Sequence, residues 1–143
     1  EGARAGGQVA AARADVEAAV ARAGGRVALR EAGTLVGLAG SVTTVAAMVL
    51  DLPTYDSEVL HHSVIGARDV HAAAERLLAM THAQRAALPY MHPGRVDVIG
   101  AGALVLSVVV EACGLDSVVV SEHDILDGIA WSLTRPPEMI TRA

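Results

Sequence analysis

Short apolar runs alternate with longer helical segments along this 143-residue chain, and the alternation limits the possible folds more than any other feature. The runs are Thr34–Leu38, Val96–Ile99 and Ser117–Val120, and each would be apolar on both faces of a strand. Such strands are typical of parallel sheets whose two faces are covered by helices. The sequence therefore predicts an α/β fold with a short, mostly parallel sheet.

Helical patterns fill most of the chain between these runs. The expected helices span Gln8–Ala23, Thr43–Leu50, Ala67–Met80, Ala103–Ala112 and, with Ser121 as the cap, about residues 121–133. Residues 58–65 alternate imperfectly and are expected to be extended. The length favours a single domain over residues 1–143, with a structured part at 8–133 and flexible ends.

Charge and composition argue against two classes of partner. The net charge is −5, the chain contains no Lys, and its Arg residues do not cluster, whereas nucleic-acid binding needs a concentrated positive field. The most apolar segment, Val98–Val110, is shorter than the roughly 20 residues that span a bilayer. Cys113 has no second Cys to pair with. We therefore expect a soluble, cytoplasmic protein with neither a nucleic-acid nor a membrane partner.

The first apolar run leads into a glycine turn that is rich in hydroxyl groups. Gly37 and Gly40 are followed by Ser41, Thr43 and Thr44, and then by the start of a helix. Unpaired amides and the helix dipole at such a position favour an anion, so we predict that these five residues bind phosphate. A tight strand-to-helix turn capped by Ser41 is the alternative interpretation.

A second glycine turn at Gly100 and Gly102 follows the second apolar run. In an open α/β sheet the carboxyl ends of parallel strands share one edge, so both turns are expected to face one ligand. Close packing of strand and helix would explain these two glycines equally well. Neither turn matches a Walker loop or a dinucleotide fingerprint, because Gly40 is followed by Ser41 and a third glycine is missing after Gly102.

No catalytic group can be assigned from spacing. His61 and His62 would point to opposite faces of a strand, and the other histidines fall in separate elements, so no metal site is expected from this chain. Asp97 lies within an expected strand and Glu122 just after one, and each could reach the ligand edge or could be an ordinary strand-end charge. The sequence predicts a binding edge without a catalyst.

Three segments in register resemble the exopolyphosphatase and guanosine pentaphosphate phosphatase (Ppx/GppA) family. Residues 37–48 (GLAGSVTTVAAM) resemble its Gly-x-x-Gly-Thr-x-Thr-Thr-Leu-Ala loop, and residues 95–106 (RVDVIGAGALVL) resemble its Arg-x-Asp-x-Ile segment. Residues 118–133 (VVVSEHDILDGIAWSL) resemble its Val-Ser-x-x-Gly-Leu ending. Ser41 stands where the family usually has Thr, a change that keeps the hydroxyl group.

The resemblance implies a ribonuclease-H-like fold of the actin, Hsp70 and sugar-kinase superfamily. It implies the C-terminal half of the core of a hydrolase that removes terminal phosphate from polyphosphate or guanosine pentaphosphate with Mg²⁺. Gly37, Gly40, Ser41, Thr43 and Thr44 would contact phosphate, and Gly100 and Gly102 would lie on the far wall of the cleft.

The family's Asp-x-Gly-Gly-Gly-Ser loop and catalytic Glu do not occur in residues 1–143, so the expected partner is the parent's N-terminal domain. The chain alone is then expected to be inactive, and an exposed sheet edge would favour a homodimer. Two alternatives remain open. One is a non-catalytic phosphate-sensing or oligomerisation domain, and the other is half of a sugar or acetate kinase with ATP at Gly100–Gly102.

Overall fold

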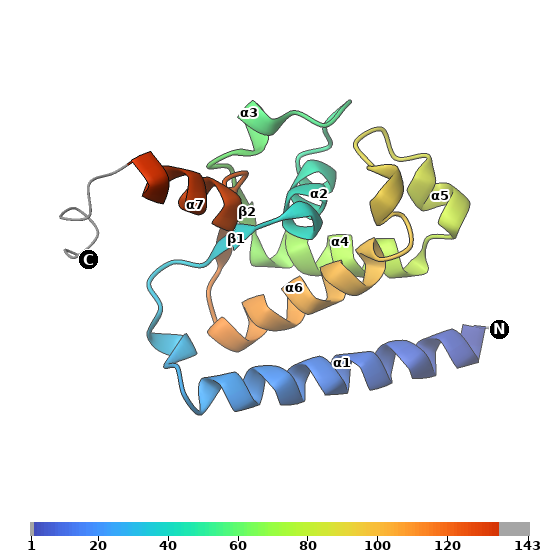
Figure 1. Ribbon diagram of the computed structural model, residues 1–143. Coiled ribbons are helices and arrows are strands. Elements are labelled where there is room, and N and C mark those ends of the chain that lie inside the picture. Colours follow the sequence, from blue (N-terminus) through green and yellow to red (C-terminus); the bar gives the residue numbers. More distant parts are fainter. Residues whose placement is uncertain (1, 135–143) are drawn as a thin grey trace.

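The computed structural model describes residues 2–134, in which helices pack with a small sheet (Figure 1). The helices are α1 (Gly2–Gly24), α2 (Gly40–Val49), α3 (Ser57–Leu60), α4 (Ala67–Ala79), α5 (His82–Ala86), α6 (Ile99–Cys113) and α7 (Ile125–Thr134). Two 3-10 turns, η1 (Leu29–Glu31) and η2 (Pro93–Arg95), lie between them. The strands are β1 (Val36–Leu38), β2 (Val64–Gly66) and β3 (Ser117–Ser121).

The three strands form a sheet in the order β1-β3-β2. β1 runs parallel to β3, with Val36 opposite Val119, whereas β2 runs antiparallel to β3, with Ile65 opposite Val118. The α/β class expected from the sequence is confirmed. The sheet is mixed, since only one of its two pairings is parallel.

One face of the sheet forms the core together with α2, α4 and α6. Ile65, Val118 and Val120 point from the strands into this core and are fully or almost fully buried. α1 lies along α6 in Figure 1, so that α6 has neighbours on several sides. This burial explains why the sequence of α6 is almost continuously apolar.

The opposite face of the sheet is open to solvent. Val36, Leu38 and Val64 are 54%, 47% and 60% exposed, so the expectation that helices cover both faces is wrong for this face. α7 follows β3 and, among the described residues, buries none of its own side chains. Apolar composition alone did not distinguish a strand buried on both faces from one buried on a single face.

The predicted strand at Val96–Ile99 is wrong. η2 and a turn occupy this region, and α6 begins at Ile99, so Gly100 and Gly102 lie in the first turn of a helix and do not follow a strand. A short apolar run has the same pattern in a buried strand and in a buried helix, which accounts for the error. Residues 58–65 are also only partly extended, because Asp56 caps α3 by accepting hydrogen bonds from the N–H groups of Glu58 and Val59.

Other helix boundaries were predicted closely. α4 and the end of α6 agree with the expected ranges, and Gly114 ends α6 in the left-handed conformation at φ 68°. α1 starts at Gly2, before the expected Gln8, and the expected flexibility of the C-terminal end concerns residues outside the described range. Across the described part of the chain, no helix has the length and apolar character needed to cross a bilayer.

The N-terminus of α7 differs from the predicted one. Ser121 belongs to β3, and the cap is Asp124, whose Oδ1 accepts a hydrogen bond from the N–H of Leu126 at 2.8 Å. The N–H of Asp124 in turn donates to Oδ2 of Asp127 at 2.8 Å. Two carboxylates therefore occupy the start of this helix.

Candidate functional site

The turn between β1 and α2 has an unusual backbone. Ala39 adopts φ 69° and ψ 169°, a conformation that non-glycine residues rarely take, and α2 begins directly after it at Gly40. Gly37 is buried, and a Cβ atom there would lie 2.7 Å from Val42 and 3.0 Å from Val118. Gly37 therefore lets the strand approach the first turn of α2 closely, which is a packing role.

The first amides of α2 are only partly used. The N–H groups of Val42 and Thr43 donate to the carbonyl of Ala39, at 3.1 and 3.2 Å. Within residues 2–134, the N–H groups of Gly40 and Ser41 have no hydrogen-bond partner, and no side chain caps the helix. Because Ala39 is exposed and the two amide-bearing residues are half-buried, the turn is not sealed beneath other side chains.

Arg95, from η2, lies against this turn. A Cβ atom at Gly40 would overlap the Arg95 guanidinium, and Nη1 of Arg95 donates to the Thr44 hydroxyl at 3.3 Å. A side chain at position 40 would therefore displace the guanidinium from this place. The arginine therefore adds a full positive charge to the partial positive charge at the start of α2.

The two predicted threonines are buried and have protein partners. The Thr44 hydroxyl donates to the Gly40 carbonyl at 2.7 Å, a bond to the residue four positions earlier that shapes the first turn. Thr43 Oγ1 lies 2.8 Å from the Tyr55 hydroxyl and 3.4 Å from the Gly40 carbonyl. Contact of Thr43 and Thr44 with phosphate remains a prediction. Among the described residues, the groups at this turn without a protein hydrogen-bond partner are the Gly40 and Ser41 amides and the Ser41 hydroxyl.

Tyr55 joins this turn to Glu122, at the end of β3. The Tyr55 hydroxyl lies 2.7 Å from Glu122 Oε1. Burial raises the pKa of Tyr55, the hydrogen bond with Thr43 lowers it, and the hydrogen bond and charge of Glu122 raise it further. Tyr55 therefore stays protonated at neutral pH, and its one proton is directed to the carboxylate.

The two predicted glycine turns meet only in part. A Cβ atom at Gly102 would overlap the Ser41 side chain, so Gly102 lies directly against the β1–α2 turn. Gly100 instead faces α4, where a Cβ atom would lie 3.5 Å from Leu78 Cδ2 and 3.7 Å from the Leu77 carbonyl. Gly102 therefore contacts the candidate site, whereas Gly100 serves helix packing.

Sequence reasoning missed Arg95 and Tyr55 as site residues. Arg95 approaches residues more than 50 positions away, and no local pattern encodes that contact. The available signal was that Arg95 opens the segment that resembles the family's Arg-x-Asp-x-Ile pattern. Glu122 does reach the site through Tyr55, while Asp97 is exposed and lies 3.3 Å from His82 Nε2.

The histidines also differ from expectation. His61 and His62 lie in the turn after α3, where His62 has φ 65°, and their rings stack at 3.8 Å. The expectation that they point to opposite faces of a strand is therefore wrong. Over residues 2–134, no group of three His, Cys, Asp or Glu side chains is arranged to hold a metal ion.

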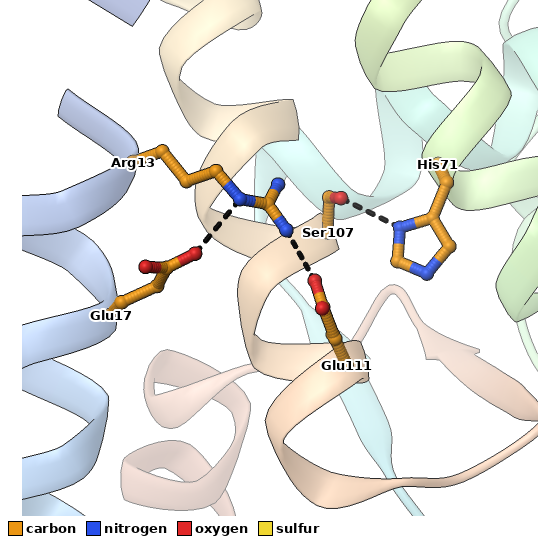
Figure 2. Close-up of polar contacts among 5 residues, drawn as sticks. All are labelled: Arg13, Glu17, His71, Ser107 and Glu111. Atoms are coloured by element: carbon orange, nitrogen blue, oxygen red, sulfur yellow. Dashed lines mark hydrogen bonds and ion pairs between the residues drawn. The ribbon is translucent and has the colours of Figure 1, made fainter. Parts of the chain in front are cut away.

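Other polar contacts join helices away from this turn (Figure 2). His71 Nδ1, on α4, lies 2.7 Å from the Ser107 hydroxyl of α6, and Arg13, on α1, pairs with Glu17 at 2.8 Å and with Glu111. Ser107 is buried in mid-helix, where the surrounding amides are engaged in helix bonds and cannot form an oxyanion hole. The His71–Ser107 pair is therefore a packing contact and not a nucleophile with its base.

Comparison with known proteins places this chain beside phosphatases. A profile of the Ppx/GppA phosphatase family matches residues 5–135. Exopolyphosphatase 2 of Mycobacterium tuberculosis is 49% identical over 102 residues, which cover 68% of this chain and 32% of that protein. A crystal structure of an exopolyphosphatase-like protein superposes with a TM-score of 0.84 and 37% identity, covering 88% of this chain and 42% of the other.

The Aquifex aeolicus member of the Ppx/GppA family has the same fold, with a TM-score of 0.66 at 24% identity over 71% of this chain and 33% of that one. The chain thus spans about a third of the mycobacterial and Aquifex proteins and 42% of the exopolyphosphatase-like protein.

Proposed function

The chain belongs to the Ppx/GppA phosphatase family, and on that premise we propose that it is the phosphate-binding part of a phosphohydrolase. The proposed reaction removes the terminal phosphate of inorganic polyphosphate or of guanosine pentaphosphate. The family and the actin-like fold support a phosphohydrolase domain. Two of the relatives are named an exopolyphosphatase and an exopolyphosphatase-like protein, which favours polyphosphate as the substrate class.

The uncapped start of α2 beside Arg95 carries the proposal. The N–H groups of Gly40 and Ser41 and the Arg95 guanidinium are hydrogen-bond donors gathered at a helix N-terminus. Phosphate oxygens accept hydrogen bonds from such donors, and a guanidinium makes these bonds stronger through its charge. Thr43 and Thr44 support the site by holding the turn in shape, and Ser41 adds a hydroxyl at its edge.

Magnesium is proposed on family grounds alone. Glu122 is the one carboxylate that contacts the candidate site through the bonds described, and it is already bonded to Tyr55. The described residues do not fit a metal site of their own. A Mg²⁺ ion would therefore need ligands from the substrate phosphates, water or other protein segments, and no step is assigned to it here.

We expect the 143-residue chain alone to bind phosphate groups without hydrolysing them. Glu122 is held by Tyr55, and no other carboxylate or imidazole of residues 2–134 is placed by a described contact to activate water at the turn. A base would have to come from other segments of a longer protein. Magnesium-dependent release of phosphate from polyphosphate by this chain, at the rate of a full-length relative, would contradict that expectation.

A binding experiment tests the site itself. Titration of ¹⁵N-labelled protein with sodium tripolyphosphate should shift the amides of Gly40 and Ser41, and Arg95→Gln should weaken the affinity about tenfold or more, because a charged hydrogen bond contributes about 1.5–3 kcal/mol. Arg68→Gln, which removes an exposed arginine of α4, is the matched control and should bind as the unmodified chain does. Equal affinity in all three proteins would reject the site.

A further inference from the structure

A chain of contacts connects the turn after α3, through the end of β3, with the β1–α2 turn. The backbone N–H of Glu122 donates to Nδ1 of His61 at 3.2 Å. The side chain of Glu122 lies 2.7 Å from the Tyr55 hydroxyl, which lies 2.8 Å from Thr43 Oγ1 in the first turn of α2. Three contacts therefore link a histidine to the turn that carries the candidate anion site.

The first of these contacts depends on the protonation state of His61. Nδ1 can accept the Glu122 N–H only when it carries no proton, so His61 is neutral with its proton on Nε2. A protonated imidazole has N–H groups on both nitrogens and would direct one of them at the Glu122 N–H. Protonation of His61 therefore breaks the first contact.

The groups around His61 influence the pH at which its imidazole takes up a proton. The His62 ring stacks on it at 3.8 Å and the His123 ring lies at 4.4 Å, with Trp131 in edge contact with His123 at 5.3 Å. Partial burial and these two imidazoles lower the pKa of His61, while the charges of Glu122 and Asp127 raise it. The neutral form, which keeps the contact, is thus favoured to a lower pH than in an unperturbed histidine.

We infer that His61, Glu122 and Tyr55 form a proton-sensitive link that sets the shape of the anion-binding turn. With neutral His61, Glu122 is held in place and fixes Tyr55 and Thr43. With protonated His61, the backbone bond is lost and the new positive charge attracts the Glu122 carboxylate away from Tyr55. The turn then loosens and binds an anion more weakly.

The groups that face this link come from several elements. His62 lies on the same turn as His61. The side chains of His123 and Asp127 approach His61 from the β3–α7 connection and the first turn of α7. Arg95 approaches Tyr55 and the start of α2. The inference about regulation rests on the proposed function of the turn. The mechanical coupling between His61 and the turn does not depend on that function.

The coupling is tested by ¹H–¹⁵N spectra of the whole chain between pH 7.5 and 5. We expect the amides of Glu122, Gly40 and Ser41 to shift together, with one midpoint below the ordinary histidine pKa of 6.5. In Tyr55→Phe, the Glu122 amide should still shift while the Gly40 and Ser41 shifts fall to background. Tyr90→Phe removes the hydroxyl of the other tyrosine and should keep the full coupled shift.

The effect on binding is measured with sulfate, a tetrahedral oxyanion whose charge is constant over this range. Sulfate should bind more weakly at pH 5.5 than at 7.5, and His61→Gln should lose most of this pH dependence, because an amide oxygen can accept the Glu122 N–H at either pH. The link would be overturned if the Gly40 and Ser41 amides did not shift with pH in the unmodified chain. It would also be overturned if these shifts persisted in Tyr55→Phe. Coupled shifts without sulfate binding at either pH would leave the link standing and count against the proposed function.

Discussion

The two helices that follow the two parallel strands begin in opposite ways. α2 and α7 follow β1 and β3, which lie side by side in the sheet. α2 starts uncapped beside Arg95, whereas α7 starts on the carboxylates of Asp124 and Asp127. Position at the end of a parallel strand is therefore not enough to make an anion site, because the side chains at the helix start decide which charge is favoured.

The two helices also differ in how far their side chains are buried. α2 buries six residues, including Val45 and Thr44, which have no exposed surface, whereas α7 buries none and leaves Ile125 75% exposed. A rigid helix start suits a site that must keep amides and a guanidinium in register. The start of α7 instead depends on its cap.

The largest contrast is expected from the glycines of the two helices. Gly40→Ala would push the Arg95 guanidinium from the α2 turn, which we expect to reduce tripolyphosphate affinity at least about tenfold with little loss of stability, because the far end of a flexible side chain can move aside. Gly128→Ala, in α7, meets no atom within 4 Å and should stabilise the protein by about 0.5–1 kcal/mol. Urea unfolding measures the change in stability, and amide titration measures the change in affinity. Equal changes in the two variants would contradict the contrast between α2 and α7.

Trimming one apolar side chain in each helix tests the difference in packing. Val45→Ala should cost about 2 kcal/mol, since Val45 is fully buried and its truncation leaves a cavity. Ile129→Ala, in the half-exposed surface of α7, should change stability by no more than about 0.5 kcal/mol. Denaturant midpoints compare the two, and a larger loss for Ile129→Ala would show that α7 is packed in solution.

Removing the α7 cap should have a smaller effect. Asp124→Ala leaves the N–H of Leu126 without its acceptor and should cost about 1 kcal/mol, seen as faster hydrogen exchange confined to α7. Ser41→Ala is the matched change at the start of α2. It should leave exchange in α2 unaltered, because no side chain caps that helix. Slower exchange in α2 than in α7 should persist in both variants.

The smallest expected effect is the pH dependence of stability from His61. Its pKa is lowered in the folded state, mainly by partial burial and then by His62 and His123, so the unfolded chain binds a proton more readily. Its contribution to stability is therefore full above the unfolded pKa of 6.5 and declines as the pH falls toward the folded value. Urea unfolding at pH 7.5, 6.5 and 5.5 should show this decline, and His61→Gln should reduce it.

Local sequence signals predicted the elements whose limits are set by nearby residues. β1 and β3 were found from apolar runs next to turn residues, and the end of α6 was found from Gly114, which adopts a positive φ. The glycine turn at 37–40 was found for the same reason. These features depend on backbone preference and on periodicity over a few residues.

The contacts that complete the candidate site could not be predicted in this way. Arg95 reaches Gly40 and Thr44, and Tyr55 joins Thr43 to Glu122, which lies 67 positions after Tyr55. Both contacts depend on how whole elements pack. The false strand at Val96–Ile99 has a related cause, because burial of α6 on several sides removed the polar face that marks most helices. Tertiary packing, and not local preference, set these features.

The backbone conformation of Ala39 bears on any attempt to stabilise this protein. Its backbone lies in a region that glycine occupies freely, and its carbonyl holds the amides of Val42 and Thr43. A glycine there would relieve the strain and also allow the bend to sample other shapes before any anion arrives. Removing the methyl group of Ala39 would therefore raise the thermal stability of the protein and lower the preorganisation of the turn for anion binding.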